Sequence, residues 1–403
     1  MGVLKTLIGL IIAFALIGGA LHYQQRQFGT GPRVSAGAPV GDTVEVAFVA
    51  NAVEGSISVI DVSSRQLLGT IDAKPDGANV GFFRDPEQWA AQSVIEARAG
   101  LNYAQDTDLS RDGTVLFISR GYLADVVAMD IATGDILWRT PIAGVRADHM
   151  DISPDGSTLF VSAVIRGGNV VEALDTATGS KLGAIQAGDW PHDVHVTPDG
   201  ERVYIASLGD MQLDLEERDA LSSSYKVTIA SAASFEVLSE LSFEAGVRPF
   251  QVTGDETRLY AQLSNTHAII ARDLQTGQLT ARIDLPVSEG VTEEDWDFEA
   301  PHHGLSLTPD ESLLCVAGRA SDYAAIVSTP DFETEETIEV GDAPSWAAVS
   351  EDGRYCLLPN TRSDDVSIVD IENRREVARL AVGRGPKHIT MGRIPATVAA
   401  LLK

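Results

Sequence analysis

Residues 190–200 read WPHDVHVTPDG, a short apolar stretch that begins with a proline and ends in a Pro-Asp-Gly turn. Proline presets φ and glycine supplies a positive φ, so these residue types favour a tight turn. Similar phrases begin at Ser110, Ser153, Thr197, Thr253, Thr308 and Ser350, at spacings of 43, 44, 56, 55 and 42 residues. A period of this length is typical of the four-stranded blades of a β-propeller.

Each repeat predicts four strands, because apolar stretches rich in β-branched and aromatic residues alternate with turn residues. The first unit, whose second strand is expected at 46–51, lacks an inner strand, whereas segment 386–391 matches an inner strand and has no blade after it. We therefore predict an all-β fold with a single seven-bladed β-propeller over residues 44–392. Pairing of the C-terminal strand with the N-terminal strands would close the ring and leave no open sheet edge. We expect residues 393–403 to form a loose helical tail.

The repeats resemble those of the YVTN-type seven-bladed β-propeller family. Val49-Ala50-Asn51 stands where the namesake residues of that family fall, and the resemblance covers about residues 44–392. It implies the fold but leaves the function open, because one fold hosts many functions.

The N-terminal segment differs in character from the repeats. Residues 6–21 carry no charge, which is short for a membrane-spanning helix and long enough for the apolar part of a signal peptide. We expect a signal peptide or membrane anchor at 1–22 and a linker at 23–43. The protein is then predicted to be periplasmic or otherwise extracytoplasmic, either released or anchored to the cytoplasmic membrane.

Composition excludes one class of partner. The chain has 30 Lys and Arg against 58 Asp and Glu, a net charge of −28. Such a surface repels nucleic acid, so we predict no nucleic-acid partner. Its two cysteines, Cys315 and Cys356, fall in matching second strands of successive blades. They are either buried small side chains or a bond between blades, which would require an oxidising compartment.

Three segments are too long for ordinary turns: 74–103, 208–225 and 285–300. All three are expected on the face from which the inner strands enter, called here the top face. The first contains a helix signal, with Asp85 as N-cap, Pro86 at the first helical position and Gly100 past the end. Long ordered loops are usually functional. The acidic residues between Glu289 and Glu299 could bind Ca²⁺, but they lack a patterned glycine and a fixed ligand spacing, which favours a solvated loop.

Histidines recur where the inner strands begin. His149, His192, His303 and His388 occupy this place in four different blades. Inner strands line the axial channel, so these side chains are expected to converge. Imidazole is a common ligand of copper, zinc and iron, and the pattern therefore predicts a transition-metal site. Asp106, Asp148 and Asp193 could orient the rings.

Two other interpretations of these histidines stay open. Arg146, Arg248, Arg384 and Lys387 also stand just before inner strands and, with His302, could form a positive mouth that binds a small anionic ligand. Alternatively, the histidines are hydrogen-bonded plugs of a structural channel.

The histidine-rich mouth also resembles the propellers of nitrous oxide reductases, through Pro191-His192-Asp193, and of haem-binding nitrite reductases. The chain lacks the cupredoxin domain of the first and the haem-attachment motif of the second, so neither activity is implied. YVTN-like propellers also resemble lactonases and amine dehydrogenase subunits. We predict a channel mouth that binds a metal or an anionic small molecule, with redox or hydrolytic chemistry left open. The alternative is a non-catalytic scaffold that binds a protein partner through the three top-face loops.

Overall fold

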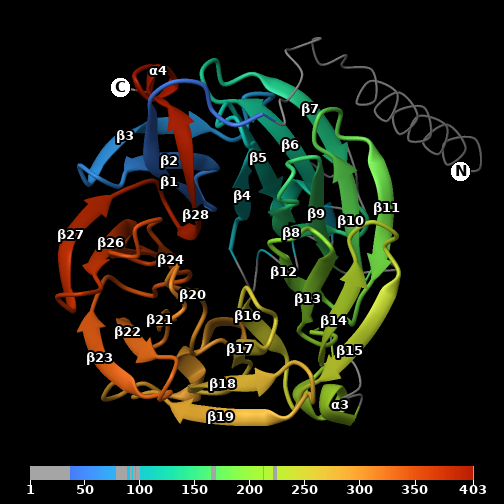
Figure 1. Ribbon diagram of the computed structural model, residues 1–403, viewed down its shortest axis with the longest axis vertical. Helices are drawn as coiled ribbons and strands as arrows, with labels where there is room; N and C mark the ends of the chain where they lie inside the picture. The colour runs from blue at the N-terminus through green and yellow to red at the C-terminus, as the bar shows by residue number, and fades with distance from the viewer. Residues whose placement is uncertain are drawn as a thin grey trace, which may run out of the picture.

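The computed structural model describes residues 37–78, 100–164, 169–211, 213–220 and 225–402, together with residues 89, 90, 93 and 96. Within these residues, 28 strands form seven four-stranded antiparallel sheets arranged in a ring (Figure 1). The predicted all-β, seven-bladed propeller is confirmed. The segment 1–22, expected to be a signal peptide or anchor, lies outside the described residues. None of the helices in the described part of the chain is long and apolar enough to cross a membrane.

Each blade runs from an inner strand at the channel to an outer strand at the rim, and blade 1 takes its inner strand from the end of the chain. The inner strands of blades 2 to 7 and then blade 1 are β4 (Asp106–Leu109), β8 (Arg146–Ile152), β12 (Pro191–Val196), β16 (Val247–Val252), β20 (Leu305–Leu307), β24 (Ala348–Val349) and β28 (Pro386–Pro395). The second strands of blades 1 to 7 are β1 (Thr43–Asn51), β5 (Val115–Arg120), β9 (Thr158–Val164), β13 (Arg202–Ser207), β17 (Arg258–Leu263), β21 (Leu313–Gly318) and β25 (Tyr355–Asn360).

The two outer layers follow in the same order. The third strands are β2 (Ser56–Asp61), β6 (Asp125–Asp130), β10 (Val170–Asp175), β14 (Lys226–Ser231), β18 (Ala268–Asp273), β22 (Tyr323–Ser328) and β26 (Asp365–Asp370). The outer strands are β3 (Gln66–Asp72), β7 (Ile136–Pro141), β11 (Lys181–Gln186), β15 (Val237–Ser242), β19 (Leu279–Asp284), β23 (Thr334–Glu339) and β27 (Arg375–Ala381). Short helices η1 (Gly121–Leu123), α3 (Leu215–Ala220), η3 (Glu293–Asp295), η4 (Asp297–Glu299) and α4 (Ala396–Ala399) lie in connections or at the C-terminal end.

The turn between inner and second strands explains why the repeated phrase decides the fold. The hydroxyl of Ser153 donates to Asp155 at 2.6 Å, and the same pairing recurs in the equivalent turns of blades 2 and 4 to 7. The next residue takes a positive φ, 74° at Gly156 and 53° at Glu256. Glycine adopts this conformation without the cost that a Cβ adds. The repeated residues therefore provide the hydrogen bond and the backbone conformation that form the turn.

The ring closes as predicted, by pairing β28 with β1 (Figure 1). The register runs from Thr43 opposite Pro395 to Asn51 opposite Pro386, so the closing strand extends beyond the expected Met391. The tail that we expected to be loose is packed: Val398 and Ala399 of α4 are buried in the cluster between blades 1 and 2. The C-terminal end thus adds apolar packing as well as a strand.

The hydrophobic core lies between neighbouring blades. Phe48 of β1 packs in one cluster with Leu116 of β5, for example. Cys315 of β21 and Cys356 of β25 form a disulfide. Of the two interpretations of these cysteines, the bond between blades 6 and 7 is the one the structure contains.

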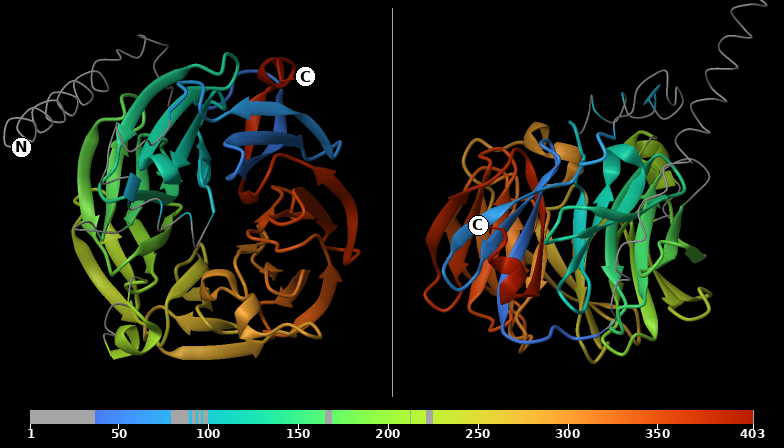
Figure 2. Two further views of the ribbon diagram at one scale, coloured as in Figure 1. Left: turned by 180° about the vertical axis from the view of Figure 1, so that it is seen from behind. Right: turned by 90° about the horizontal axis from the view of Figure 1, so that it is seen from above.

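The described residues of the three long loops make specific contacts, and Figure 2 shows the ring from behind and from above. The N-cap expected at Asp85 lies outside the described residues, as does the expected end of the helix before Gly100. Gly100 has φ 70°, and its N–H donates to the carbonyl of Glu96. In the loop 285–300, Asp297 pairs with Arg319 at 3.1 Å and Glu299 pairs with Arg218. Two residues of the acidic run between Glu289 and Glu299 therefore form ion pairs with arginines.

Candidate functional site

The inner strands bring His149, His192, His303 and His388 together in the channel. The ring centroid of His149 lies 4.7 Å from that of His192 and 5.1 Å from that of His388, and the His192 and His303 centroids lie 5.3 Å apart. None of the four is more than 7% exposed. Residues that are up to 239 positions apart in sequence therefore form one buried cluster, called here the central cluster.

β-Bulges at the strand starts explain how neighbouring residues both reach the channel. The pairing register shifts between Ala147 and Met150 in β8 and between Pro191 and Val194 in β12. A bulge leaves residues unpaired and interrupts the alternation of side chains between the two faces of a strand. Asp148 with His149, and His192 with Asp193, are therefore buried as consecutive pairs.

The central cluster contains two overlapping sets of side chains that could hold a metal ion. One comprises His149, His192 and His303, the other Asp106, His149 and His388, and within each set the ligand atoms lie within 4.8 Å of one another. The Nε2 atoms of His192 and His303 are 3.4 Å apart. Two nitrogens bound at about 2.0–2.1 Å to one tetrahedral ion would be separated by about 3.3–3.4 Å. This spacing fits a tetrahedral ion.

Hydrogen bonds orient two of the three rings of the first set. His303 Nδ1 lies 2.9 Å from the carbonyl oxygen of Ser345, so this nitrogen donates and Nε2 is unprotonated. His149 Nδ1 lies 3.1 Å from Asp106, and its Nε2 lies 3.2 Å from the amide nitrogen of Gln105, so an ion that binds this Nε2 must displace that contact. His192 Nδ1 is buried without a partner. A second hydrogen bond that orients a ligating imidazole is the usual arrangement around metals.

Asp106 is the anionic member of the cluster. Its carboxylate accepts hydrogen bonds from the backbone N–H groups of Thr107 and Met150, at 2.6 and 3.0 Å, and lies 2.6 Å from His388 Nδ1. Burial alone would raise the pKa of Asp106, but the attraction of His388 and the hydrogen bonds from His149 and His388 hold it below its ordinary value. Asp106 therefore orients two rings and balances the charge of a bound cation.

Trp346 completes the cluster from blade 7. Its ring stacks on His149 at a centroid distance of 4.6 Å and lies 4.2 Å from His388. Sequence alignment of the repeats places Trp346 at the same strand entrance as the histidines, but we did not predict a role for it. The indole shields one side of the rings from solvent.

Four cationic side chains lie beside the central cluster: Arg146, Arg248, Arg319 and Lys387, called here the cationic group. The charges of Arg248 and Arg319 both lower the pKa of His303, after the larger effect of burial. Burial and repulsion from Arg146 lower the pKa of Lys387 to about 7, and its ammonium makes no hydrogen bond with any described residue. Arg146 pairs with Asp148 at 3.3 Å and Arg319 with Asp297 at 3.1 Å, so carboxylates already neutralise part of this positive charge.

Sequence reasoning found three of these four cations. Arg319 follows β21, in the connection to β22, where nothing in the repeat pattern marks it as a channel residue. It donates to the hydroxyl of Ser345 at 2.9 Å, next to His303. Arg384, by contrast, is exposed, and its backbone N–H bonds Glu54, so it does not join the group.

Two further predicted residues have other surroundings. Asp193 accepts hydrogen bonds from the backbone N–H of Phe250 in the next blade and from His195 at 3.1 and 3.2 Å, so it connects blades 4 and 5. His302 packs against His267 and Tyr323 rather than against the four clustered histidines.

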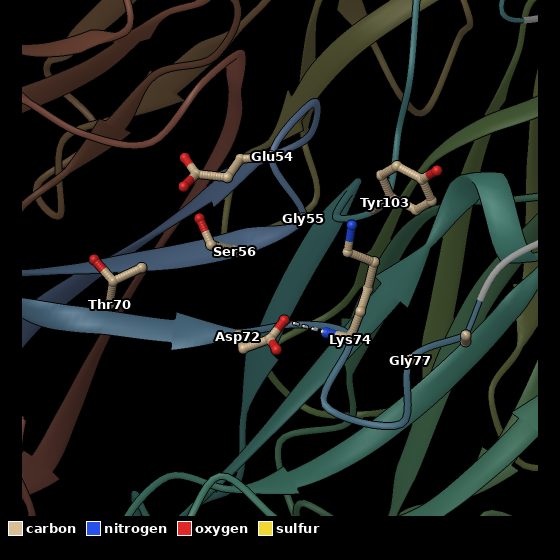
Figure 3. A pocket seen from close by; sticks show the side chains of 9 residues that line it. Glu54, Gly55, Ser56, Thr70, Asp72, Lys74, Gly77 and Tyr103 are labelled. Atoms are coloured by element: carbon tan, nitrogen blue, oxygen red, sulfur yellow. Dashed lines mark hydrogen bonds between the residues drawn. The ribbon is translucent and has the colours of Figure 1, made fainter.

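A separate open pocket of about 660 Å³ lies between β2, β3 and the loop after β3 (Figure 3). Lys74 extends over the ring of Tyr103 at 3.6 Å, and Asp72 accepts a hydrogen bond from the backbone N–H of Lys74. None of the residues that line this pocket belongs to the central cluster. Its mixed charges and open shape point to no particular ligand.

No protein-family model and no curated sequence matches the chain. Among solved structures, hydrazine synthase from Kuenenia stuttgartiensis is similar with a TM-score of 0.60 and 16% identity, covering 80% of this chain and 91% of that one. The periplasmic gluconolactonase PpgL of Pseudomonas aeruginosa is similar with a TM-score of 0.61 and 17% identity, covering 88% and 100%. These identities show a shared propeller fold alone, and the resemblance to YVTN-type repeats stays a prediction.

Proposed function

We propose that the protein binds a transition-metal ion, copper, zinc or iron, in the central cluster and uses it to bind and activate a small anionic ligand. The observation that carries this proposal is the 3.4 Å separation of the His192 and His303 Nε2 atoms, with His149 as the third ligand. Three imidazoles leave a position open for an exogenous ligand, as in catalytic metal sites. The ion would supply Lewis-acid or redox chemistry at that position.

The cationic group supports an anionic ligand. Arg248 is 2% exposed, and it donates to Ser264 at 2.9 Å and to the carbonyl of Phe298, so its charge has no carboxylate partner in these contacts. Lys387, whose pKa burial lowers to about 7, adds an amine that carries a partial positive charge near neutral pH. Charge-assisted hydrogen bonds to a carboxylate or phosphate would satisfy both groups.

An extracytoplasmic location is part of the proposal. The Cys315–Cys356 disulfide favours an oxidising compartment. The gluconolactonase of similar fold is described as periplasmic, which agrees with this placement. If the metal-loaded protein is an enzyme, hydrolysis of a small organic substrate is the reaction that we propose for it.

The test is metal analysis of the untagged full chain, with His149→Ala, His192→Ala, His303→Ala and His388→Ala variants. We expect stoichiometric copper, zinc or iron in the wild type. Each single change at the three direct ligands should lose most of that metal, and double variants should lose little more, because ligands of one ion act as a unit. His388→Ala should weaken binding about 10–100-fold through loss of ring orientation.

Thermal unfolding and His267→Ala serve as controls. The four changes remove channel side chains rather than the apolar core between blades, so each variant should stay folded, and His267→Ala should leave metal in the central cluster. If the four variants keep their metal content, or the wild type binds none while each change lowers stability, the histidines are structural plugs and the proposal fails.

A second candidate function is favoured by apolar side chains on the top-face loops. Trp89, Leu215, Val287 and Phe298 are 40%, 44%, 51% and 36% exposed, and each lies in one of the three long segments. A contiguous patch of exposed apolar groups marks a protein-binding surface, and in the scaffold function these four side chains would form one. If the protein is a scaffold, a partner protein should co-purify with the wild type. The double variant Leu215→Ser with Val287→Ser should no longer recover this partner, and its metal content should be unchanged.

A further inference from the structure

A second pair of histidines lies outside the central cluster. His267 precedes β18 and His302 precedes β20, and their ring centroids are 4.7 Å apart at an interplanar angle of 84°. His302 is fully buried. It is adjacent in sequence to His303, but His303 contacts His192 in the channel, whereas His302 contacts His267 and Tyr323. The two neighbouring residues therefore serve different clusters.

The tautomer of His302 is determined by a hydrogen-bond chain. The hydroxyl of Tyr323 donates to the carbonyl oxygen of Pro286 at 2.9 Å, and His302 Nε2 lies 3.0 Å from the same hydroxyl oxygen. Since that hydrogen is already committed, Nε2 of His302 is the donor and Nδ1 carries a free lone pair. This is the arrangement in which an outer hydrogen bond orients a metal-ligating imidazole.

The pair contains an unusual concentration of unsatisfied polar atoms. His302 Nδ1, both ring nitrogens of His267 and Nε1 of Trp296 are all buried and have no hydrogen-bond partner. Trp296 lies against His267, with ring centroids 5.3 Å apart. An unpaired buried polar group costs about 1–3 kcal/mol, so groups of this kind usually face a bound water or ion.

The geometry points to a second transition-metal site, in which His267 and Nδ1 of His302 bind one ion. We propose that Trp296 Nε1 donates a hydrogen bond to the water or anion that completes the coordination. Two imidazoles bound to one ion at about 2.0–2.1 Å and at 90–110° would have centroids about 4.5–5.2 Å apart, and the observed 4.7 Å falls in this range. Imidazole nitrogens without carboxylates favour copper or zinc over calcium or magnesium.

The test counts metal equivalents on the untagged full chain after chelation and titration with Cu²⁺ or Zn²⁺. We expect two equivalents in the wild type. His302→Gln and His267→Ala should each remove the second equivalent and keep the first. The double variant His192→Ala with His303→Ala should lose the first equivalent and keep the second. Failure of the central site and failure of the outer site would therefore remove different equivalents.

Two tryptophans allow the sites to be observed separately, because bound Cu²⁺ quenches indole fluorescence at short range. Trp296 lies beside the outer pair and Trp346 beside the central cluster. Trp296→Phe should remove the quenching that accompanies the second equivalent and weaken the binding of that equivalent, because the coordinated water or anion loses a hydrogen-bond donor. Trp346→Phe should remove the quenching that accompanies the first equivalent. Tyr323→Phe should weaken the second equivalent about 10–100-fold, because His302 loses its orienting partner.

One result overturns the inference. If the wild type binds a single equivalent, and His267→Ala and His302→Gln leave both that equivalent and the Trp296 fluorescence response unchanged, the outer pair encloses water. Should His302→Gln fail to fold, His267→Ala still decides the matter, since His267 is only partly buried and its loss costs less packing.

Discussion

The histidines of the central cluster differ in charge although they touch. Burial, and repulsion from neighbouring positive groups, lower the pKa values of His192 and His303 well below the ordinary value. For His149, burial acts in the same direction, but the hydrogen bond to Asp106 and the attraction of Asp148 raise its pKa. A metal ligand must be unprotonated. His192 and His303 therefore meet this requirement without help, whereas a bound cation would have to displace the proton of His149.

His195, one layer below the cluster, makes the stability of the fold depend on pH. Its Nε2 lies 3.2 Å from Asp193. Burial would lower its pKa, but the attraction of Asp193 and Asp151 and a hydrogen bond to Asp193 raise it to about 9. The unfolded value is about 6.5. The folded state thus binds more protons between these pH values, so the stabilisation is complete below pH 6.5 and is lost as pH rises toward 9.

We expect the wild type to lose more unfolding free energy between pH 6.5 and 9 than His195→Gln does. The difference should stay below about 1.4 kcal/mol per pH unit, because 29% of the side chain is exposed and solvent screens the pair. Urea unfolding at a series of pH values measures it. Parallel profiles for the two proteins would show that His195 does not gain a proton on folding.

At the scale of the strand, Gly304 sets how closely blade 6 approaches blade 7. Its φ is +130°, and a Cβ at this position would lie 2.5 Å from the Cα of Trp346. Gln262 of β17 bonds both its N–H and its carbonyl, at 2.8 and 3.2 Å. Only glycine fits here, and its neighbours in space and sequence are the site residues Trp346 and His303.

Gly304→Ala should therefore lower stability by about 1–3 kcal/mol, the usual cost of overpacking, and weaken metal binding in the central cluster at least tenfold. The backbone contact cannot relax without separating His303 from its partners. Gly134→Ala is the matched control, since Gly134 also has positive φ but its Cβ would meet nothing within 4 Å. Equal effects of the two changes on metal affinity would contradict the argument.

Local chemistry explains which elements could be predicted from sequence. The turn phrase specifies its own hydrogen bonds, so blade number, strand order and ring closure followed from the repeat. The histidine cluster followed from aligning strand entrances. The position of Arg319 and the pairing of His302 with His267 could not be predicted, because each depends on how the loops of neighbouring blades meet. The bulges that bury Asp148 and Asp193 beside histidines also leave no mark in the local sequence pattern.

The disulfide joins β21 and β25. The sequence predicted that these two strands occupy matching positions in neighbouring blades, but it did not determine whether their cysteines form a bond. Cys315 and Cys356 are 41 residues apart, a loop whose closure in the unfolded chain corresponds to roughly 3–4 kcal/mol. Reducing agent should lower the melting temperature of the wild type by several degrees. Cys315→Ala with Cys356→Ala should melt at the lower temperature with or without reductant. An identical melting temperature for reduced and oxidised wild type would show that the bond adds no stability.

For the whole molecule, a strongly acidic net charge coexists with a group of cationic side chains at the site. The chain carries −28, yet the channel mouth presents Arg146, Arg248, Arg319 and Lys387. At physiological ionic strength, charges separated by more than about 8 Å are largely screened. An anion at the mouth therefore experiences the nearby side chains, the arginines together with Asp148 and Asp297, far more strongly than the distant acidic surface, and the overall acidity does not exclude an anionic ligand.

The closure of the ring is the property on which all seven blades depend, and truncation tests it. Ending the chain at Gly383 removes β28, which exposes the edge of β1 and deletes His388. Two blades then lose their shared packing, so we expect no cooperative unfolding transition and a strong tendency to aggregate. Ending the chain at Pro395 removes only α4 and should lower the melting temperature while keeping one sharp transition, because β28 stays paired from Pro386 to Pro395. Circular dichroism melts and size-exclusion chromatography of the two truncations make the comparison. A chain ending at Gly383 that melts as sharply and at as high a temperature as the full chain would mean that the C-terminal strand does not hold the ring together.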